Sequence, residues 1–133
     1  MGALTDLGLF ALRVLGGVGI AIHGYPKVFE AGKIAGLTDA ARTMGFPVPV
    51  LFAWAAALSE LLGGILVALG LGTRVAAFFI FCTMSAAAFI HHRADPLGTR
   101  ELALAYWTIS LTVMLTGPGG LSLDRMLGRE GKK

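Results

Sequence analysis

The chain has 133 residues, of which 56% are hydrophobic and 14% are charged, and its mean hydropathy is +0.76. A soluble domain carries about 25% charged residues, so this composition is typical of membrane proteins and excludes intrinsic disorder. Cys82 is the single cysteine, which excludes an intrachain disulfide framework, a dithiol relay and a zinc site of paired cysteines. The net charge of +3 is scattered and indicates no nucleic-acid surface. The length fits one domain over residues 1–133.

Four apolar segments predict an all-α integral membrane protein, a bundle of four helices. A spanning helix needs about 20 largely apolar residues. The predicted helices cover about residues 6–28, 48–70, 73–92 and 99–116. The fourth has the shortest apolar run and spans only if residues 99–101 are included. The first has Asp6 where a secretory signal has basic residues, so we expect a membrane helix rather than a cleaved signal.

The loop after the first span is polar and contains a helical pattern of its own. Ile34, Leu37, Ala41 and Met44 recur at helical spacing, which predicts a short helix at the membrane interface. The loop ends at Pro47 and Pro49, which stop a helix.

Four spans place both termini on one side of the membrane. Five basic residues lie on that side: Arg74, Arg125, Arg129, Lys132 and Lys133. Five also lie on the other side: Lys27, Lys33, Arg42, Arg93 and Arg100. The positive-inside count is therefore a tie. We favour cytoplasmic termini because four of the basic residues crowd the short C-terminal tail.

Arg13 and Glu60 are charged residues within the first two spans. A charge at the bilayer centre costs about 2.5–3.5 kcal/mol on insertion scales, so such groups usually face inward and pair. Arg13 shares a helix stripe with glycines, and small residues flank Glu60. Counted from the first loop, Arg13 lies about 21 Å and Glu60 about 18 Å along their helices. We therefore expect a buried Arg13–Glu60 ion pair, which either fixes helix register or takes part in proton relay or anion binding.

A second polar group is expected at the loop end of the bundle. His23, Lys27, His91 and Glu101 are predicted to line one polar pocket, with the ion pair beneath it. Histidine exchanges protons near neutral pH, and Lys27 suits an anion or a quinone carbonyl. Glu101 is expected on an inward-facing stripe of the fourth helix, where it would orient His23 or take its proton. The other small or polar members of this stripe are Ala105, Thr108 and Thr112. The competing interpretation is that these groups only satisfy helix ends and lipid headgroups. The sequence identifies no catalytic residue.

Other polar and aromatic residues receive simpler interpretations. His91 and His92 point about 100° apart on a helix and lack further ligands at suitable spacing, so no metal site is expected. Arg93 and Arg100 are expected to reach the lipid headgroups. Aromatic residues near helix ends suit the membrane interface; these are Tyr25, Trp54, Tyr106 and Trp107. Cys82 is expected to be inert packing.

These residues also carry a resemblance to a known family. Arg13 followed by His23-Gly24 and Lys27 resembles the first helix of DoxX-like small membrane proteins. The run from Glu60 to Gly64, with the Leu69–Arg74 turn, is similar to that family's second helix, and Glu101–Leu104 and Gly117–Asp124 are similar to its fourth helix and exit. Pro26 departs slightly from the usual form. The similarity covers nearly the whole chain, and its four parts are specific only together and in order.

The resemblance implies a four-helix bacterial inner-membrane protein. Some members are named for thiosulfate:quinone oxidoreductase, and others associate with redox or detoxifying enzymes. Relatives include a methylamine-utilisation membrane protein and a eukaryotic secretory cargo receptor. The family therefore includes enzyme subunits, accessory proteins and receptors, and the name alone does not establish catalysis.

Three functional hypotheses follow. The leading one is an accessory or quinone-interacting subunit of a redox system, in the lipid bilayer with a soluble oxidoreductase partner. The second is a non-enzymatic scaffold that recruits such a partner, and the third is a carrier of a small solute. The sequence has no haem, flavin, dinucleotide or metal motif, so electrons would come from elsewhere and quinone is the ligand that the first hypothesis implies. A homo-oligomer is compatible with all three.

Overall fold

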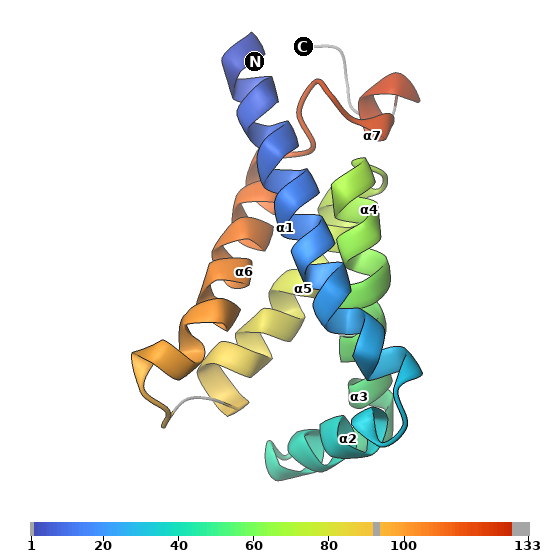
Figure 1. Cartoon of the computed structure of the whole chain (residues 1–133), viewed down its shortest axis with the longest axis vertical. Coiled ribbons are helices and arrows are strands. Elements are labelled where there is room, and N and C mark those ends of the chain that lie inside the picture. Colours follow the sequence, from blue (N-terminus) through green and yellow to red (C-terminus); the bar gives the residue numbers. More distant parts are fainter. Residues whose placement is uncertain (1, 92–93, 129–133) are drawn as a thin grey trace.

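The structure, a computed structural model, describes residues 2–91 and 94–128. The described chain is all-α. Its elements are α1 (Ala3–Phe29), α2 (Lys33–Thr43), α3 (Pro49–Leu58), the π-helical η1 (Ser59–Gly63), α4 (Gly64–Leu69), α5 (Thr73–Ala86), the π-helical η2 (Ala87–His91), α6 (Leu97–Thr116) and α7 (Leu123–Met126). Because α3, η1 and α4 are continuous, as are α5 and η2, four long helical segments run side by side (Figure 1).

Three of these segments, among the residues described, are long and apolar enough to cross a membrane. They are Ala3–Phe29, Pro49–Leu69 and Thr73–His91. The 20-residue α6 is more polar and carries Arg100 and Glu101 near its start. Large apolar side chains point outward along the bundle, among them Leu15, Ile22 and Val75, which are each at least 64% exposed. An apolar outer surface of this kind is that of an integral membrane protein.

Glycine lets the first two segments pack closely. A Cβ added to Gly17 would lie 2.5 Å from the carbonyl oxygen of Gly64, and one added to Gly64 would lie 2.6 Å from that of Gly17. Gly24 meets the backbone of Glu60 and Leu61 in the same way. Small residues at such crossings allow the backbone contact that drives helix association in lipid.

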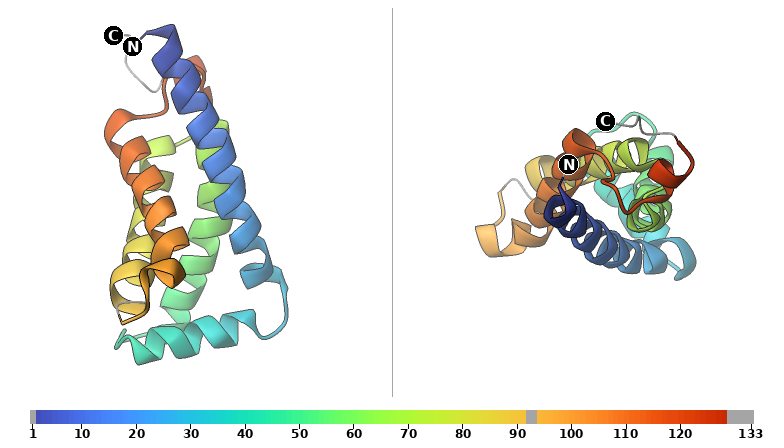
Figure 2. Two further views of the ribbon diagram at one scale, coloured as in Figure 1. Left: turned by 60° about the vertical axis from the view of Figure 1, so that its left-hand side comes forward. Right: turned by 90° about the horizontal axis from the view of Figure 1, so that it is seen from above.

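The core lies where the four segments meet. Its buried members come from α1, α4, α5 and α6: Ile20, Val67, Ala76, Ala77, Ile80, Met84 and Val113. The helix expected in the first loop is present as α2, which lies across one end of the bundle (Figure 2). At the opposite end, α7 folds back over the bundle near the start of α1 (Figure 1).

Candidate functional site

Arg13 and Glu60 occupy separate sites, so the prediction of an ion pair between them is wrong. Gly17 lies opposite Gly64 and Gly24 lies opposite Glu60, which places Lys27 about level with residue 57 of the second segment. The depth count had set Lys27 level with Val48. The register of α1 against the second segment in the structure therefore differs from the register assumed in the depth count by about nine residues, or about 14 Å at 1.5 Å per residue.

Arg13 fastens the C-terminal tail to the bundle. Its side chain is fully buried, and its guanidinium donates to the carbonyls of Val67 (3.2 Å), Ala68 (3.4 Å) and Leu121. Carbonyls in the last turn of a helix have no partner within the helix and are favourable for a cation. Arg13 thus closes the C-terminal end of α4 and holds the segment that leads to α7.

Asp124 holds the same tail from the other side. Its carboxylate accepts hydrogen bonds from the backbone N–H groups of Gly72 (2.8 Å) and Thr73 (2.9 Å) and from the Thr73 hydroxyl (2.7 Å). These are the unpaired N–H groups at the start of α5, which a carboxylate caps well. Asp6 accepts a further bond from the N–H of Gly120. The end of the bundle that carries Arg13 is therefore a structural joint.

Lys27 is the ion-pair partner of Glu60. The Lys27 Nζ lies 2.7 Å from Glu60 Oε1 and 2.6 Å from Glu60 Oε2. The two side chains are 31% and 5% exposed, respectively. An ion pair this deep needs good geometry to offset its desolvation, and here the lysine meets both carboxylate oxygens.

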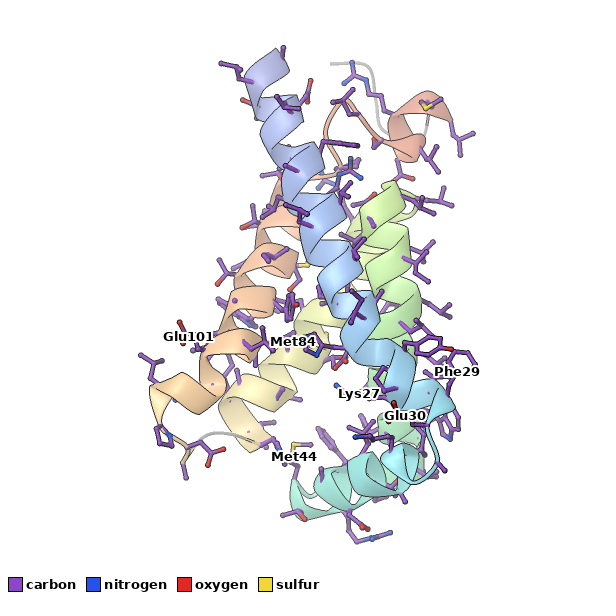
Figure 3. All side chains as sticks on the ribbon, viewed as in Figure 1. Lys27, Phe29, Glu30, Met44, Met84 and Glu101 are labelled. Atoms are coloured by element: carbon purple, nitrogen blue, oxygen red, sulfur yellow. The ribbon has the colours of Figure 1, made fainter. Side chains whose placement is uncertain are left out.

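The Lys27–Glu60 pair borders a cavity of about 200 Å³. Four polar or charged side chains line it: His23, Lys27, Glu60 and Tyr106. Apolar walls come from Ile20, Met84, Ala87, Leu102 and Ala103. Figure 3 shows Lys27 and Met84 pointing into the space between α1 and the α5–α6 pair. A small apolar cavity with a few convergent polar groups is the usual form of a ligand site.

Glycine also makes room for Tyr106 beside His23. A Cβ added to Gly19 would lie 2.7 Å from the Tyr106 hydroxyl oxygen. Only glycine at position 19 therefore leaves room for the Tyr106 hydroxyl. The Tyr106 ring meets the His23 imidazole edge to face, with centroids 5.8 Å apart. Tyr106 therefore belongs to the cavity rather than to an interfacial belt. This position was missed from the sequence, and Gly19, one helical turn before His23, is the signal that could have indicated it.

Two π-helical segments border this cavity. Glu60 belongs to η1, and Ala87 begins η2. A π turn adds a residue to the helix, changes the direction of the side chains around it, and occurs often at functional sites. The carbonyl of Ala88, in η2, accepts a 3.0 Å bond from Arg100 Nε, so Arg100 supports the π segment. The helical pattern of the sequence did not reveal either segment.

His91 and Glu101 are outside the lining of the cavity. Glu101 is exposed and points away from the bundle (Figure 3), and its neighbours Leu102 and Ala103 line the cavity instead. The inward polar stripe expected on α6 is also wrong, because Thr108 is exposed as Glu101 is. The hydroxyls of Thr108, Thr112 and Thr116 donate to carbonyls one turn earlier in the same helix. Hydroxyls satisfied within their own helix can face lipid.

Of the remaining residues singled out from the sequence, those that the structure describes are not among the residues lining the cavity. His92 and Arg93, like the tail from Arg129 on, lie outside the described residues. Cys82 is exposed on the outer surface rather than packed inside. Among the described residues no three His, Cys, Asp or Glu side chains are grouped as a metal site would need.

Comparison with known proteins gives the family. The DoxX family model matches residues 8–93, which include both Arg13 and the Lys27–Glu60 pair. The chain belongs to the DoxX family. Its relatives include the inner membrane protein YphA of Escherichia coli, which is 32% identical over 133 residues covering 93% of each chain. The inner membrane protein YqjF of Escherichia coli is 28% identical over 98% of this chain and 99% of its own.

A third relative carries a functional name. It is the Bacillus subtilis protein named "Putative oxidoreductase CatD", 30% identical over 96% of this chain and 92% of its own. No solved structure matches the chain significantly. The helices long enough to span a membrane and the relatives together make this DoxX protein a multi-pass protein of the inner membrane.

Proposed function

We propose that this DoxX protein is an accessory membrane subunit of a redox system and that it binds a quinone headgroup in the cavity beside Lys27 and Glu60. The observation that carries the proposal is the ion pair of the half-buried Lys27 with the buried Glu60 at one wall of a small, otherwise largely apolar cavity. The name of the relative CatD supports a redox role.

The chemistry of the cavity fits a quinone ring. A quinone is a neutral, flat ring whose two carbonyl oxygens accept hydrogen bonds. Lys27, His23 and the Tyr106 hydroxyl supply donor groups, while Ile20 and Met84 supply apolar contact. A cavity of about 150 Å³ holds a benzene ring in an engineered protein, so about 200 Å³ leaves room for one substituted ring. Because Lys27 and Glu60 balance each other's charge, the site suits a neutral ligand better than an anion.

The electrons come from a partner in this proposal. Reduction of a quinone to its quinol takes two electrons and two protons. The sequence has no haem, flavin or dinucleotide motif, so we assign the electrons to a soluble oxidoreductase. His23 is exposed and lies in the cavity, where its imidazole can pass protons from water to the ring.

The proposal also includes the membrane arrangement. The start of α1 and α7 lie at the same end of the bundle (Figure 1), which an even number of crossings explains and three crossings do not. We therefore assign α6 as a fourth span in a single domain over residues 1–133. In that arrangement α2 lies at the membrane interface on the cavity side.

Binding of quinone to purified protein tests the proposal. Decylubiquinone should bind to the wild type in nanodiscs, and Lys27→Met should weaken binding by about tenfold, as loss of one charged hydrogen bond does. Lys33→Met, which removes an exposed lysine paired with Glu30 at 4.0 Å, is the matched control. If the wild type binds no quinone but still copurifies with a soluble oxidoreductase, the scaffold hypothesis replaces this one. Accumulation of a solute by proteoliposomes without a partner would favour the carrier hypothesis.

A further inference from the structure

The open side of the cavity lies between α1 and α6. Of its nine lining residues, the two in the exposed class are His23 on α1 and Leu102 on α6, the latter 51% exposed. Glu60 and Met84, on the second and third segments, are buried. The cavity is therefore closed on the side of those segments and open on the face that α1 and α6 share.

The two helices separate at the cavity. They touch where Gly16 meets Ile109 and where Gly19 and His23 meet Tyr106. Beyond that point they diverge towards the end that α2 crosses (Figure 1). The glycines that allow contact lie on one side of the cavity only, and the His23–Tyr106 ring contact is the last bridge before the gap.

This opening lies on the side of the bundle and within the depth of the helices. Leu102 is about five residues, or about 8 Å, inside α6 from its first residue. Leu102 shares its face of α6 with Ala105, one turn further along, which is also exposed and apolar. The rim therefore has a polar edge at His23 on α1 and an apolar edge at Leu102 on α6, which suits a ligand with a polar headgroup and a hydrocarbon tail.

We infer that the ligand of this cavity enters sideways from the bilayer, between α1 and α6 past Leu102, and is a lipid-phase amphiphile with its headgroup at Lys27 and its hydrocarbon tail left in the gap. The inference rests on the proposed quinone-binding function and extends it by giving the entry route and the need for a tail. It also excludes small water-soluble solutes as the physiological ligand of this site. Leu102 controls passage, while Lys27 and Tyr106 hold the bound headgroup.

A gate and a binding contact differ in kinetics. A side chain that narrows the route slows entry and exit together and leaves the affinity unchanged, whereas a lost contact chiefly speeds release. Leu102→Trp should therefore lower both the association and the dissociation rate of decylubiquinone by about tenfold, with Kd altered less than about twofold. Leu102→Ala should raise both rates. The exposure of Leu102 makes both variants compatible with folding.

Stopped-flow exchange measures these rates. Wild-type protein in nanodiscs, loaded with decylubiquinone, is mixed with empty vesicles, and bound quinone is followed through quenching of tryptophan fluorescence. Leu115→Trp is the matched control, because Leu115 is 67% exposed on the same helix but lies away from the cavity, and its rates should match the wild type. Unchanged rates in both Leu102 variants, with quinone bound by the wild type, would overturn the entry route and leave the proposed function standing. Absence of quinone binding by the wild type would overturn both.

Discussion

At the scale of single residues, Lys27 and Glu60 differ in exposure, and therefore in the energetic cost that each pays when its ion-pair partner is removed. The Glu60 side chain is 5% exposed and the Lys27 side chain 31% exposed. A lysine that loses its partner can extend its flexible stem towards water, whereas a buried carboxylate cannot. The pair is therefore asymmetric, although both groups carry unit charge.

This asymmetry predicts unequal costs of substitution. Lys27→Met leaves a buried carboxylate unpaired and should lower the free energy of unfolding by about 3–5 kcal/mol. Glu60→Gln keeps the volume and should cost only about 1–2 kcal/mol. The double variant should cost less than the sum of the single variants. Reversible unfolding in mixed micelles measures all three, and equal costs with strict additivity would refute the pair as described.

Arg13 supplies an internal control for this comparison of single and double variants. Its hydrogen bonds go to Val67, Ala68 and Leu121, at a different level of the bundle from Glu60. Substitutions at separate sites add within about 0.5 kcal/mol, so Arg13→Met combined with Glu60→Gln should be additive. Strong coupling there would indicate that the two charges interact after all.

At the scale of elements, helix approach is set by a few glycines whose neighbours are backbone atoms. The space beside Gly17 is filled by the Gly64 carbonyl and the Ala68 N–H, which cannot move without moving α4. Gly8 lies in the same helix, and nothing would lie within 4 Å of a Cβ added there. The two glycines thus differ in surroundings while sharing one helix.

Alanine substitution should separate these two glycines. Gly17→Ala forces α1 and α4 apart and should destabilise the protein by about 1–3 kcal/mol. Gly8→Ala should stabilise it by about 0.5–1 kcal/mol, the usual gain in a helix interior. Thermal unfolding of both variants in detergent gives the comparison. A similar loss of stability in both would contradict the close approach of the two helices.

The sequence predicted the helices better than the contacts between them. Apolar length located the four long helical segments, three of which, among the described residues, are long and apolar enough to cross a membrane. The helical spacing in the first loop located α2. The register of α1 against the second segment was missed because it depends on where Gly17 and Gly64 meet, and the depth count assumed that the helices start level. The buried position of Glu60 was predicted and is confirmed, but the π segment η1 that contains it was missed, because a π turn leaves no periodic signal. Glu101 was misplaced because threonines that bond within their own helix look the same in sequence as an inward polar stripe.

At the scale of the whole molecule, the structure alters the charge count that sets orientation. The sequence gives five basic residues near each end of the bundle. Lys27, however, lies in the cavity, paired with Glu60, and so is not a loop charge. The end that carries the termini then has five basic residues against four, and the side with more lysine and arginine usually stays in the cytoplasm. The joint formed by Arg13 and Asp124 keeps α7 on that side.

We therefore predict cytoplasmic termini, with α2 and the loop before α6 on the outer side. Cysteines at Leu127 and Gly98 report the two ends, because Leu127 is 62% exposed and nothing would lie within 4 Å of a Cβ at Gly98. Both are introduced in a Cys82→Ala background, since Cys82 is itself exposed. In spheroplasts an impermeant maleimide should label Gly98→Cys and leave Leu127→Cys unlabelled until the membrane is opened. The reverse pattern would show that the orientation is inverted. Labelling of both cysteines from the outer side, in spheroplasts and again in sealed vesicles of one orientation, would show that α6 does not cross the membrane.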